Sequence, residues 1–244
     1  EKSIESYSNY SNNPFDYMES LANRPKIKIA SKPVLISNTP NPDDVIIKSS
    51  IMYHFQCSEQ EAKQIMEESE KIDPEYKAKS MNIILHKEER RELEQVSFTF
   101  QIPISLSILT HLTRHRMHSL LIPEFTPLWD FNNFIIPATI QAKSELKNIF
   151  INAQKENMKI FEEFKNSNVS DEDLIYFYLG CQMLNVVTTM NGRTLQWILH
   201  LRCCNKAQWQ IRNICKEIAK QVSMVSPLLG KGLGPTCKTD LVCY

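Results

Sequence analysis

The clearest alternation of hydrophobic and polar positions along the chain lies at residues 95–102. Val96, Phe98, Phe100 and Ile102 share one side of an extended chain, and polar residues occupy the other side. A period of two is typical of a strand with one buried face, and we expect Pro103 to end it. Residues 27–36 predict a second strand, because isoleucines alternate with lysines before a short aliphatic run.

Helical periodicity covers most of the remaining chain. A short helix is expected near Asp43, and the capping box Ser58-Glu59-Gln60-Glu61 predicts a helix from 59 to about 70. Asp73-Pro74 marks the start of another helix, running to about 87. Apolar residues at helical spacing predict further helices at 146–164, at 170–184, at 194–202 and, capped by Asn205, at 207–222. The C-terminal half is therefore expected to be helical.

Length and composition indicate one globular domain. The 244 residues are 42% hydrophobic and 23% charged, which is ordinary for such a domain. Residues 1–24 are rich in Ser, Asn, Tyr and Glu without a sustained period, so we expect a partly ordered extension followed by a single domain at 25–244.

Charge and cysteine usage exclude several classes of protein. The formal net charge is zero, so we expect neither a nucleic acid nor a membrane as partner. No apolar run approaches the roughly 20 residues that a membrane span needs, and the N-terminal residues lack a signal-peptide core. Seven cysteines without a paired Cys-x-x-Cys favour reduced thiols and no metal site. We therefore expect a cytoplasmic protein.

A cluster of cations at Arg114-His115-Arg116 provides the first candidate chemistry. It follows an apolar helical run directly, and cations in the last turn of a helix are stabilised by roughly 0.3–1 kcal/mol each, so a stabilised helix end is the simplest interpretation. The loop that follows carries hydrogen-bonding side chains at Ser119, Glu124, Thr126 and Trp129. Such groups beside fixed positive charge suit a small molecule that bears phosphate.

A second set comprises Asn191-Gly192-Arg193, Leu201-Arg202 and the run from Ala207 to Arg212. Taken singly, an arginine on a helix is usually a solvated charge and Trp209 is usually packing. Gly192 would let the backbone approach a ligand. If one helix ran from Arg193 to Arg202, nine residues at about 100° each would place them on opposite faces, so that one helix could serve two sites.

These motifs resemble the signature of flavin-dependent thymidylate synthases. Arg-His-Arg, two variable residues and Ser match at 114–119, the family's Glu-His-x-x-Phe-Thr-Phe strand is similar to residues 94–100, and its Asn-Ala-Arg, Leu-Arg and Ala-Gln-Trp-Glu-Ile-Arg elements match at 191–212. The rest of the signature departs from the pattern. An alignment without a gap puts the family's Asn-Glu on Leu121-Ile122. An alignment with two inserted residues puts Glu124, Thr126 and Trp129 on the family's Glu, Ser and Tyr, and we prefer this second alignment.

The resemblance implies an α/β (α+β) fold, with a mixed sheet and flanking helices, in a homotetramer whose active sites are shared among subunits. It implies FAD as cofactor, with NADPH and methylene-tetrahydrofolate as possible co-substrates. The residues that would bind FAD are Arg114, His115, Arg116, Asn191, Arg193 and Glu94. Arg202 would polarise the acceptor ring as the catalytic residue, and Ser119, Glu124 and Thr126 would bind substrate.

Departures from the family pattern gather in the half of the site that binds the nucleotide. Both arginines that hold the nucleotide phosphate in the family are missing, since the second falls near Ile175; His111 stands where the family usually has Gln and Trp197 where it usually has Asn. We favour an FAD-dependent enzyme with a changed acceptor, a small ring with an acidic NH or OH. Thymidylate synthase proper, with phosphate contacts rebuilt from Lys206, His111 or another subunit, and a non-catalytic flavin-binding oligomer are the alternatives.

Overall fold

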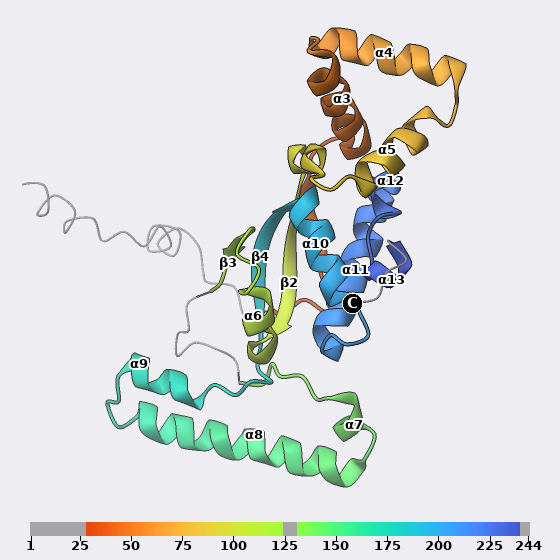
Figure 1. Ribbon diagram of the computed structural model, residues 1–244. Coiled ribbons are helices and arrows are strands. Elements are labelled where there is room, and N and C mark those ends of the chain that lie inside the picture. Colours follow the sequence, from red (N-terminus) through yellow and green to blue (C-terminus); the bar gives the residue numbers. More distant parts are fainter. Residues whose placement is uncertain (1–27, 124–130, 240–244) are drawn as a thin grey trace, which may run out of the picture.

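A four-stranded antiparallel sheet forms the centre of the computed structural model, which describes residues 28–123 and 131–239 (Figure 1). The strand order is β1 (Val34–Asn38), β2 (Ser97–Ser105), β4 (Met183–Asn191) and β3 (Ser119–Leu121). The α+β class is confirmed, but the expected mixed sheet is wrong, because every pairing among these strands is antiparallel.

One face of the sheet is buried and the other is only partly covered. Phe98, Phe100, Ile102 and Ile104 of β2 are at most 1% exposed, whereas Thr99 and Gln101 on the opposite face remain partly exposed. The helices α10 (Gly192–Arg202) and α11 (Trp209–Val225) cover the buried face (Figure 1). The predicted strand is thus confirmed, although it continues through Pro103. β1 ends opposite Gln101, so Pro103 lies where only β4 flanks β2, and its missing N–H breaks no ladder to β1.

The helix predicted over 170–184 is wrong. Its start is a short helix, α9 (Asp171–Leu174), with the 3₁₀ turn η2 (Ile175–Phe177), and the chain then becomes strand β4. Leu184, Val186, Thr188 and Met190 alternate with partly exposed residues and are each at most 2% exposed. Pairing with β2 over nine positions therefore outweighs the apolar spacing that suggested a helix.

Helices at one end of the sheet follow the predicted signals more closely. α3 (Pro42–Phe55) is longer than expected, and α4 (Glu59–Ile72) has the predicted capping box between Ser58 and Glu61. α5 (Tyr76–His86) begins two residues after Pro74. The 3₁₀ turn η1 (Arg91–Gln95) then leads into β2.

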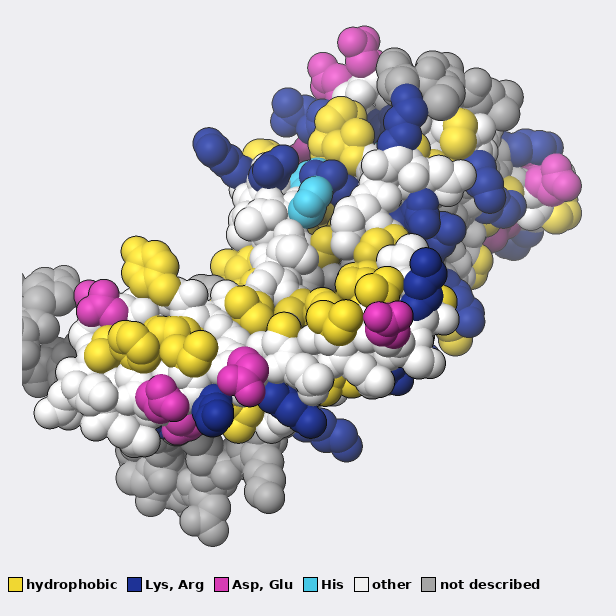
Figure 2. Space-filling view, turned by 90° about the horizontal axis from the view of Figure 1, so that it is seen from below, with side chains coloured by type: hydrophobic (Ala, Val, Ile, Leu, Met, Phe, Trp, Pro, Cys, Tyr) yellow, Lys and Arg dark blue, Asp and Glu magenta, His cyan; other side chains and the backbone are white. Residues whose placement is uncertain are grey.

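An arm at the other end of the sheet consists of α7 (Ala138–Gln141), α8 (Ser144–Lys165), α9 and η2 (Figure 1). Phe131, Phe161 and Leu174 form a small core of its own there. The predicted helix at 146–164 is confirmed, but much of its apolar stripe faces outward: Leu146, Ile149, Ile160 and Phe164 are 41–59% exposed. Figure 2 shows hydrophobic side chains exposed along this end of the molecule.

The remaining elements are α6 (Leu106–Leu112), α12 (Pro227–Gly230) and α13 (Thr236–Thr239). Asn205 does not cap α11; the side-chain oxygen of Gln208 does, accepting from the N–H groups of Gln210 and Ile211. Within 28–123 and 131–239, no helix is long and apolar enough to cross a membrane, and no cluster of residues suits a metal ion. The proposed extension at 1–24 lies outside the described residues.

Candidate active site

The cationic cluster occupies a turn rather than a helix end. α6 ends at Leu112, and residues 113–118 form the connection to β3, with the His115 N–H donating to the Leu112 carbonyl at 3.1 Å. β3 pairs with β4, where Ser119 faces Thr189. The Thr194 hydroxyl of α10 also donates to the Met117 carbonyl at 3.3 Å. These contacts hold the turn beside the point where β4 becomes α10.

The junction of β4 and α10 depends on Asn191 and Gly192. Asn191 is the N-cap of α10, and its side-chain oxygen accepts from the Thr194 N–H at 2.8 Å. The Gly192 N–H donates to the Val96 carbonyl at 3.0 Å, and a Cβ at this position would lie 2.7 Å from the Leu93 carbonyl oxygen. The expected close approach is therefore to the protein's own backbone at η1, and glycine fixes where the helix begins.

All six residues predicted to bind the cofactor line one hollow of about 630 Å³: Glu94, Arg114, His115, Arg116, Asn191 and Arg193. They come from η1, from the turn after α6 and from the N-terminus of α10. The structure thus brings together residues that lie up to about a hundred positions apart in the chain. It also adds lining residues that the sequence did not single out, among them Glu88, Arg90 and Gln196.

Positive charge dominates the hollow, although part of it is paired. Arg193 Nη1 donates to Glu94 Oε1 at 2.6 Å, so Glu94 orients that guanidinium. Arg90 Nη1 donates to Gln196 Oε1 at 3.1 Å. Arg114 and Arg116 are exposed and supply further positive charge in the turn. The N-terminus of α10, which favours negative charge, faces the same space.

Arg202, at the opposite end of α10, is held by histidines. Its Nε donates to His115 Nε2 at 2.9 Å, and its Nη2 donates to the His111 carbonyl at 3.4 Å. Burial and, next, the charges of Arg202 and His118 lower the pKa of His115 to about 4. His115 is therefore neutral at pH 7, and its Nε2 accepts from Arg202.

His111 lies beside the same guanidinium. Burial, then Arg202 and Arg114, lower its pKa, so this imidazole is also neutral. Its Nδ1 atom is buried and has no hydrogen-bond partner within the described parts of the chain. Two neutral imidazoles thus flank the single cation Arg202.

The residues predicted to bind substrate are not assembled in the same way. Ser119 lies on β3, where its carbonyl accepts from the Thr188 hydroxyl at 2.8 Å. Glu124, Thr126 and Trp129 lie outside the described residues. The role of these residues therefore stays a prediction.

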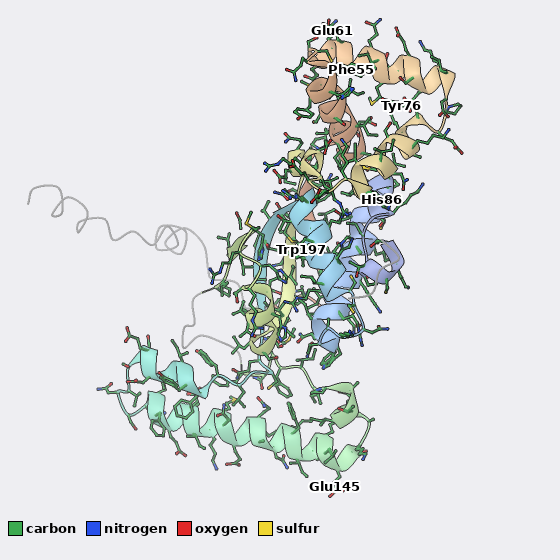
Figure 3. All side chains as sticks on the ribbon, in the orientation of Figure 1. Phe55, Glu61, Tyr76, His86, Glu145 and Trp197 are labelled. Carbon is green, nitrogen blue, oxygen red and sulfur yellow. The ribbon has the colours of Figure 1, made fainter. Side chains whose placement is uncertain are left out.

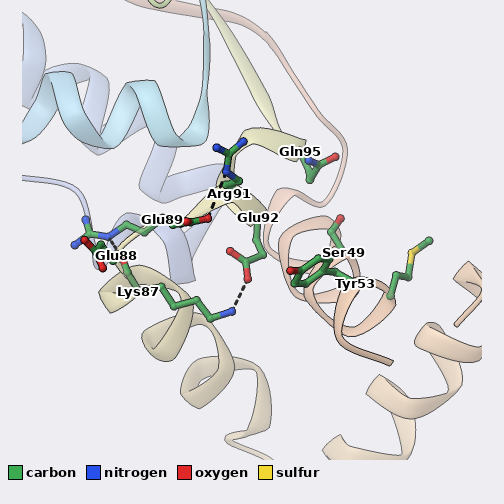
Figure 4. A pocket seen from close by; sticks show the side chains of 10 residues that line it. Ser49, Tyr53, Lys87, Glu88, Glu89, Arg91, Glu92 and Gln95 are labelled. Carbon is green, nitrogen blue, oxygen red and sulfur yellow. Dashed lines mark hydrogen bonds and ion pairs between the residues drawn. The ribbon is translucent and has the colours of Figure 1, made fainter. Parts of the chain in front are cut away.

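A second hollow of about 670 Å³ adjoins the first and lies between α3 and residues 87–95 (Figure 4). Glu88 and Arg90 line both hollows. Charges in the second hollow are largely paired, with Arg91 Nε 3.5 Å from Glu89 Oε2 and Lys87 2.5 Å from Glu92. Gln95, which stands where the resembling family has His, also lines it.

Comparison with known proteins gives the family. The family model described as "Thymidylate synthase complementing protein" matches residues 34–228. A flavin-dependent thymidylate synthase of Clostridium tetani is 31% identical over 223 residues, covering 83% of this chain and 86% of that protein. The chain belongs to the flavin-dependent thymidylate synthase family. The resemblance in the sequence is thereby confirmed, and membership makes the chain an enzyme of the flavin-dependent methyltransferase type.

Other members agree with this assignment. The flavin-dependent thymidylate synthase of Geobacter sulfurreducens is 26% identical over 212 residues, which cover 85% of this chain and 89% of that one. Among solved structures, the UMP/dUMP methylase PolB from Streptomyces cacaoi, bound with 5-Br dUMP, has a TM-score of 0.67 at 14% identity. It covers 84% of this chain and 96% of its own, and it supports the fold alone.

The first hollow suits the FAD that the family implies. Its volume falls in the range of roughly 300–1,000 Å³ that is usual for ligand pockets. Planar guanidinium groups at Arg114 and Arg116 match phosphate oxygens, and the α10 N-terminus adds backbone N–H groups. This donor set suits the two phosphates of a dinucleotide.

Proposed function

We propose that this enzyme binds FAD in the first hollow and transfers a reduced one-carbon unit to an acceptor ring other than dUMP. Support for the cofactor comes from the convergence of all six predicted residues on one hollow. Support for the changed acceptor comes from the sequence, in which both arginines that hold the nucleotide phosphate in the family are missing.

Each group of residues would have a separate task. Bound FAD would supply the hydride chemistry. Arg114, Arg116 and Arg193 would hold its phosphates, and Glu94 would fix the direction of Arg193. These side chains therefore position the cofactor without reacting themselves.

Arg202 would act on the acceptor. A fixed guanidinium stabilises an anion that develops when a ring NH or OH loses its proton, which makes the neighbouring ring carbon more nucleophilic. Because His115 and His111 are neutral, neither adds a charge that competes with Arg202 for that anion. The acceptor class that fits is a small ring with an acidic NH or OH.

Thymidylate synthesis proper is the second candidate. It is the activity named for the Clostridium tetani protein, to which the chain is 31% identical over most of both chains. In that case NADPH and methylene-tetrahydrofolate would be co-substrates, and His111, Lys206 or a neighbouring subunit would rebuild the phosphate contacts. The changed-acceptor enzyme could use the same donors.

A homotetramer with shared sites is part of the proposal. The apolar side chains exposed on α8 support it, because a contiguous apolar stripe on a single chain usually marks an interface.

Calorimetric titration of the FAD-loaded protein with dUMP and with deoxyuridine tests the acceptor. The two ligands share the ring and differ in the phosphate. Losing two charge-assisted contacts worth about 1.5–3 kcal/mol each predicts dUMP affinity two to four decades below a micromolar site. We expect nearly equal, millimolar dissociation constants for both ligands. Micromolar dUMP with much weaker deoxyuridine would favour thymidylate synthesis instead.

A further inference from the structure

Trp197 exposes a large aromatic surface inside the first hollow. It lies on α10 (Figure 3). Its side chain is 62% exposed and lines the hollow with Arg116 and Arg193. No aromatic ring of residues 28–123 or 131–239 stacks on its indole. A tryptophan left open to water in a cationic pocket forgoes the burial that usually stabilises this side chain, and so needs an explanation.

The neighbours of Trp197 define what could cover it. Arg193 lies one turn earlier on the same helix face, so the indole lies next to the guanidinium that is proposed to hold phosphate. The other aromatic rings of the hollow are engaged: His115 accepts from Arg202, and His200 is 5% exposed and lies 3.3 Å from the Gly232 carbonyl oxygen. Among the described lining residues, Trp197 therefore offers the one open aromatic plane.

We propose that Trp197 is the stacking platform for a planar ring of the bound FAD. This inference rests on the proposed function, since it needs FAD in the first hollow. Arginines neutralise the phosphates of the cofactor, whereas its flat heterocycles are stabilised most by stacking on an aromatic side chain. Both the isoalloxazine and the adenine of FAD have that shape, and the position of Trp197 beside Arg193 suits either ring next to the phosphates.

A second copy of the chain is the competing occupant. Leu201, one turn after Trp197 on the same face, is 43% exposed but does not line the hollow. If this face met another subunit, Leu201 and Trp197 would be covered together. Leu201→Ala is therefore a matched control, because it removes apolar area from the same face of α10 without touching the hollow.

The experiment measures FAD binding and molecular mass for wild type, Trp197→Ala, Trp197→Phe and Leu201→Ala. Alanine should weaken FAD binding by about 5- to 150-fold, since a base stacked on an aromatic residue is worth a few kcal/mol, while Phe should retain most of the affinity. Leu201→Ala should bind like wild type, and the mass should not change in any variant.

Binding of FMN and of ADP to the same variants shows which ring of FAD stacks on Trp197. If the isoalloxazine stacks on Trp197, the alanine variant loses affinity for FMN, and bound flavin becomes brighter in Trp197→Phe because the quenching indole is gone. If the adenine stacks there, the loss is in ADP binding and flavin emission is unchanged. Either result supports the proposal.

Two outcomes would overturn the inference. Unchanged FAD affinity in Trp197→Ala would remove the stacking role, and a fall in mass and FAD affinity shared by Trp197→Ala and Leu201→Ala would assign the face to a subunit interface. Failure of wild type to bind FAD would instead refute the proposed function, so the two failures are distinct.

Discussion

Replacing Gly192 with alanine tests the geometry that starts α10 and places two of the residues proposed to bind FAD, Asn191 and Arg193. The added Cβ would lie 2.7 Å from the Leu93 carbonyl oxygen and 3.0 Å from Val96 Cγ2. Leu93 and Val96 are at most 1% exposed, so neither has free space to move into. The clash is with backbone, which gives way less easily than the end of a flexible side chain.

The change in the free energy of unfolding follows from two opposing effects. Overpacking in a filled core typically costs about 1–3 kcal/mol. Alanine returns up to about 1 kcal/mol, because it favours helix more than glycine does. Because the closest contact is with backbone, the cost should lie near about 2–3 kcal/mol, so the net loss should be about 1–2 kcal/mol. That loss lowers the melting temperature of a chain of this size by about 2–8 °C.

Thermal unfolding and FAD titration at one protein concentration measure both consequences. Asn191 and Arg193 flank the altered residue, so FAD affinity should fall as well. Gly180→Ala is the matched control, because its Cβ would meet only Ser107 Cβ at 3.6 Å, an ordinary contact. We expect that control to stay within about 0.5 kcal/mol of wild type. Equal melting temperature and FAD affinity in Gly192→Ala and wild type would refute the reasoning.

Three further predictions concern the cations, the pH dependence and the assembly. Replacing both Arg114 and Arg116 with alanine should abolish FAD uptake while the circular dichroism spectrum stays unchanged; unaltered affinity would contradict their assignment. The His115 ring should titrate near pH 4 by NMR, below its ordinary pKa of 6.5, so that the stability it contributes is complete above pH 6.5 and is lost as the pH falls toward 4. Arg202→Ala should raise that pKa, and an unchanged value would show that Arg202 does not contribute to lowering it. Ile149→Asp on α8 should lower the mass measured by light scattering from a tetramer to a smaller species, whereas Lys147→Asp, on the same helix, serves as the charge control; an unchanged tetramer would move the interface elsewhere.

Short sequence patterns predicted the helices and strands that depend on interactions between residues close together in the chain. The capping box at Ser58 and the alternation in β2 are confirmed because their hydrogen bonds and pattern lie within short stretches. β4 was missed because its strand character depends on pairing with β2, about 90 positions earlier, while the residues from Leu174 to Leu184 also fit a helical period. Periodicity also could not show that the apolar stripe of α8 faces outward.

The lining of the candidate site could be predicted where a sequence motif supplied it. Arg114 and Arg193 belong to two matched elements, and the fold brings both to one hollow. Glu88 and Arg90 were missed because they belong to a run of charged residues, which is typical of a solvated loop. Their position depends on tertiary contacts, including the bond from Arg90 to Gln196 and the left-handed backbone of Arg90, with φ of 49°.

The continuous helix α10 leads to a last prediction, which concerns whether Arg193 and Arg202 of one active site come from the same subunit or from two. Arg193 and Arg202 are nine residues apart on it, so they point to opposite faces about 14 Å apart along the axis, and Arg202 does not line the hollow that Arg193 lines. If each site takes one of these arginines from one subunit and the other from its neighbour, co-expressing Arg193→Ala with Arg202→Ala should restore activity. Random assembly would leave about a quarter of the sites with both arginines, although each variant alone has none. Turnover measured on purified mixed oligomers, compared with each variant alone, tests this. No recovery in mixed oligomers of verified composition would show that both arginines of a site belong to the same chain, with His115, which lines the hollow and accepts from Arg202, as the link between them.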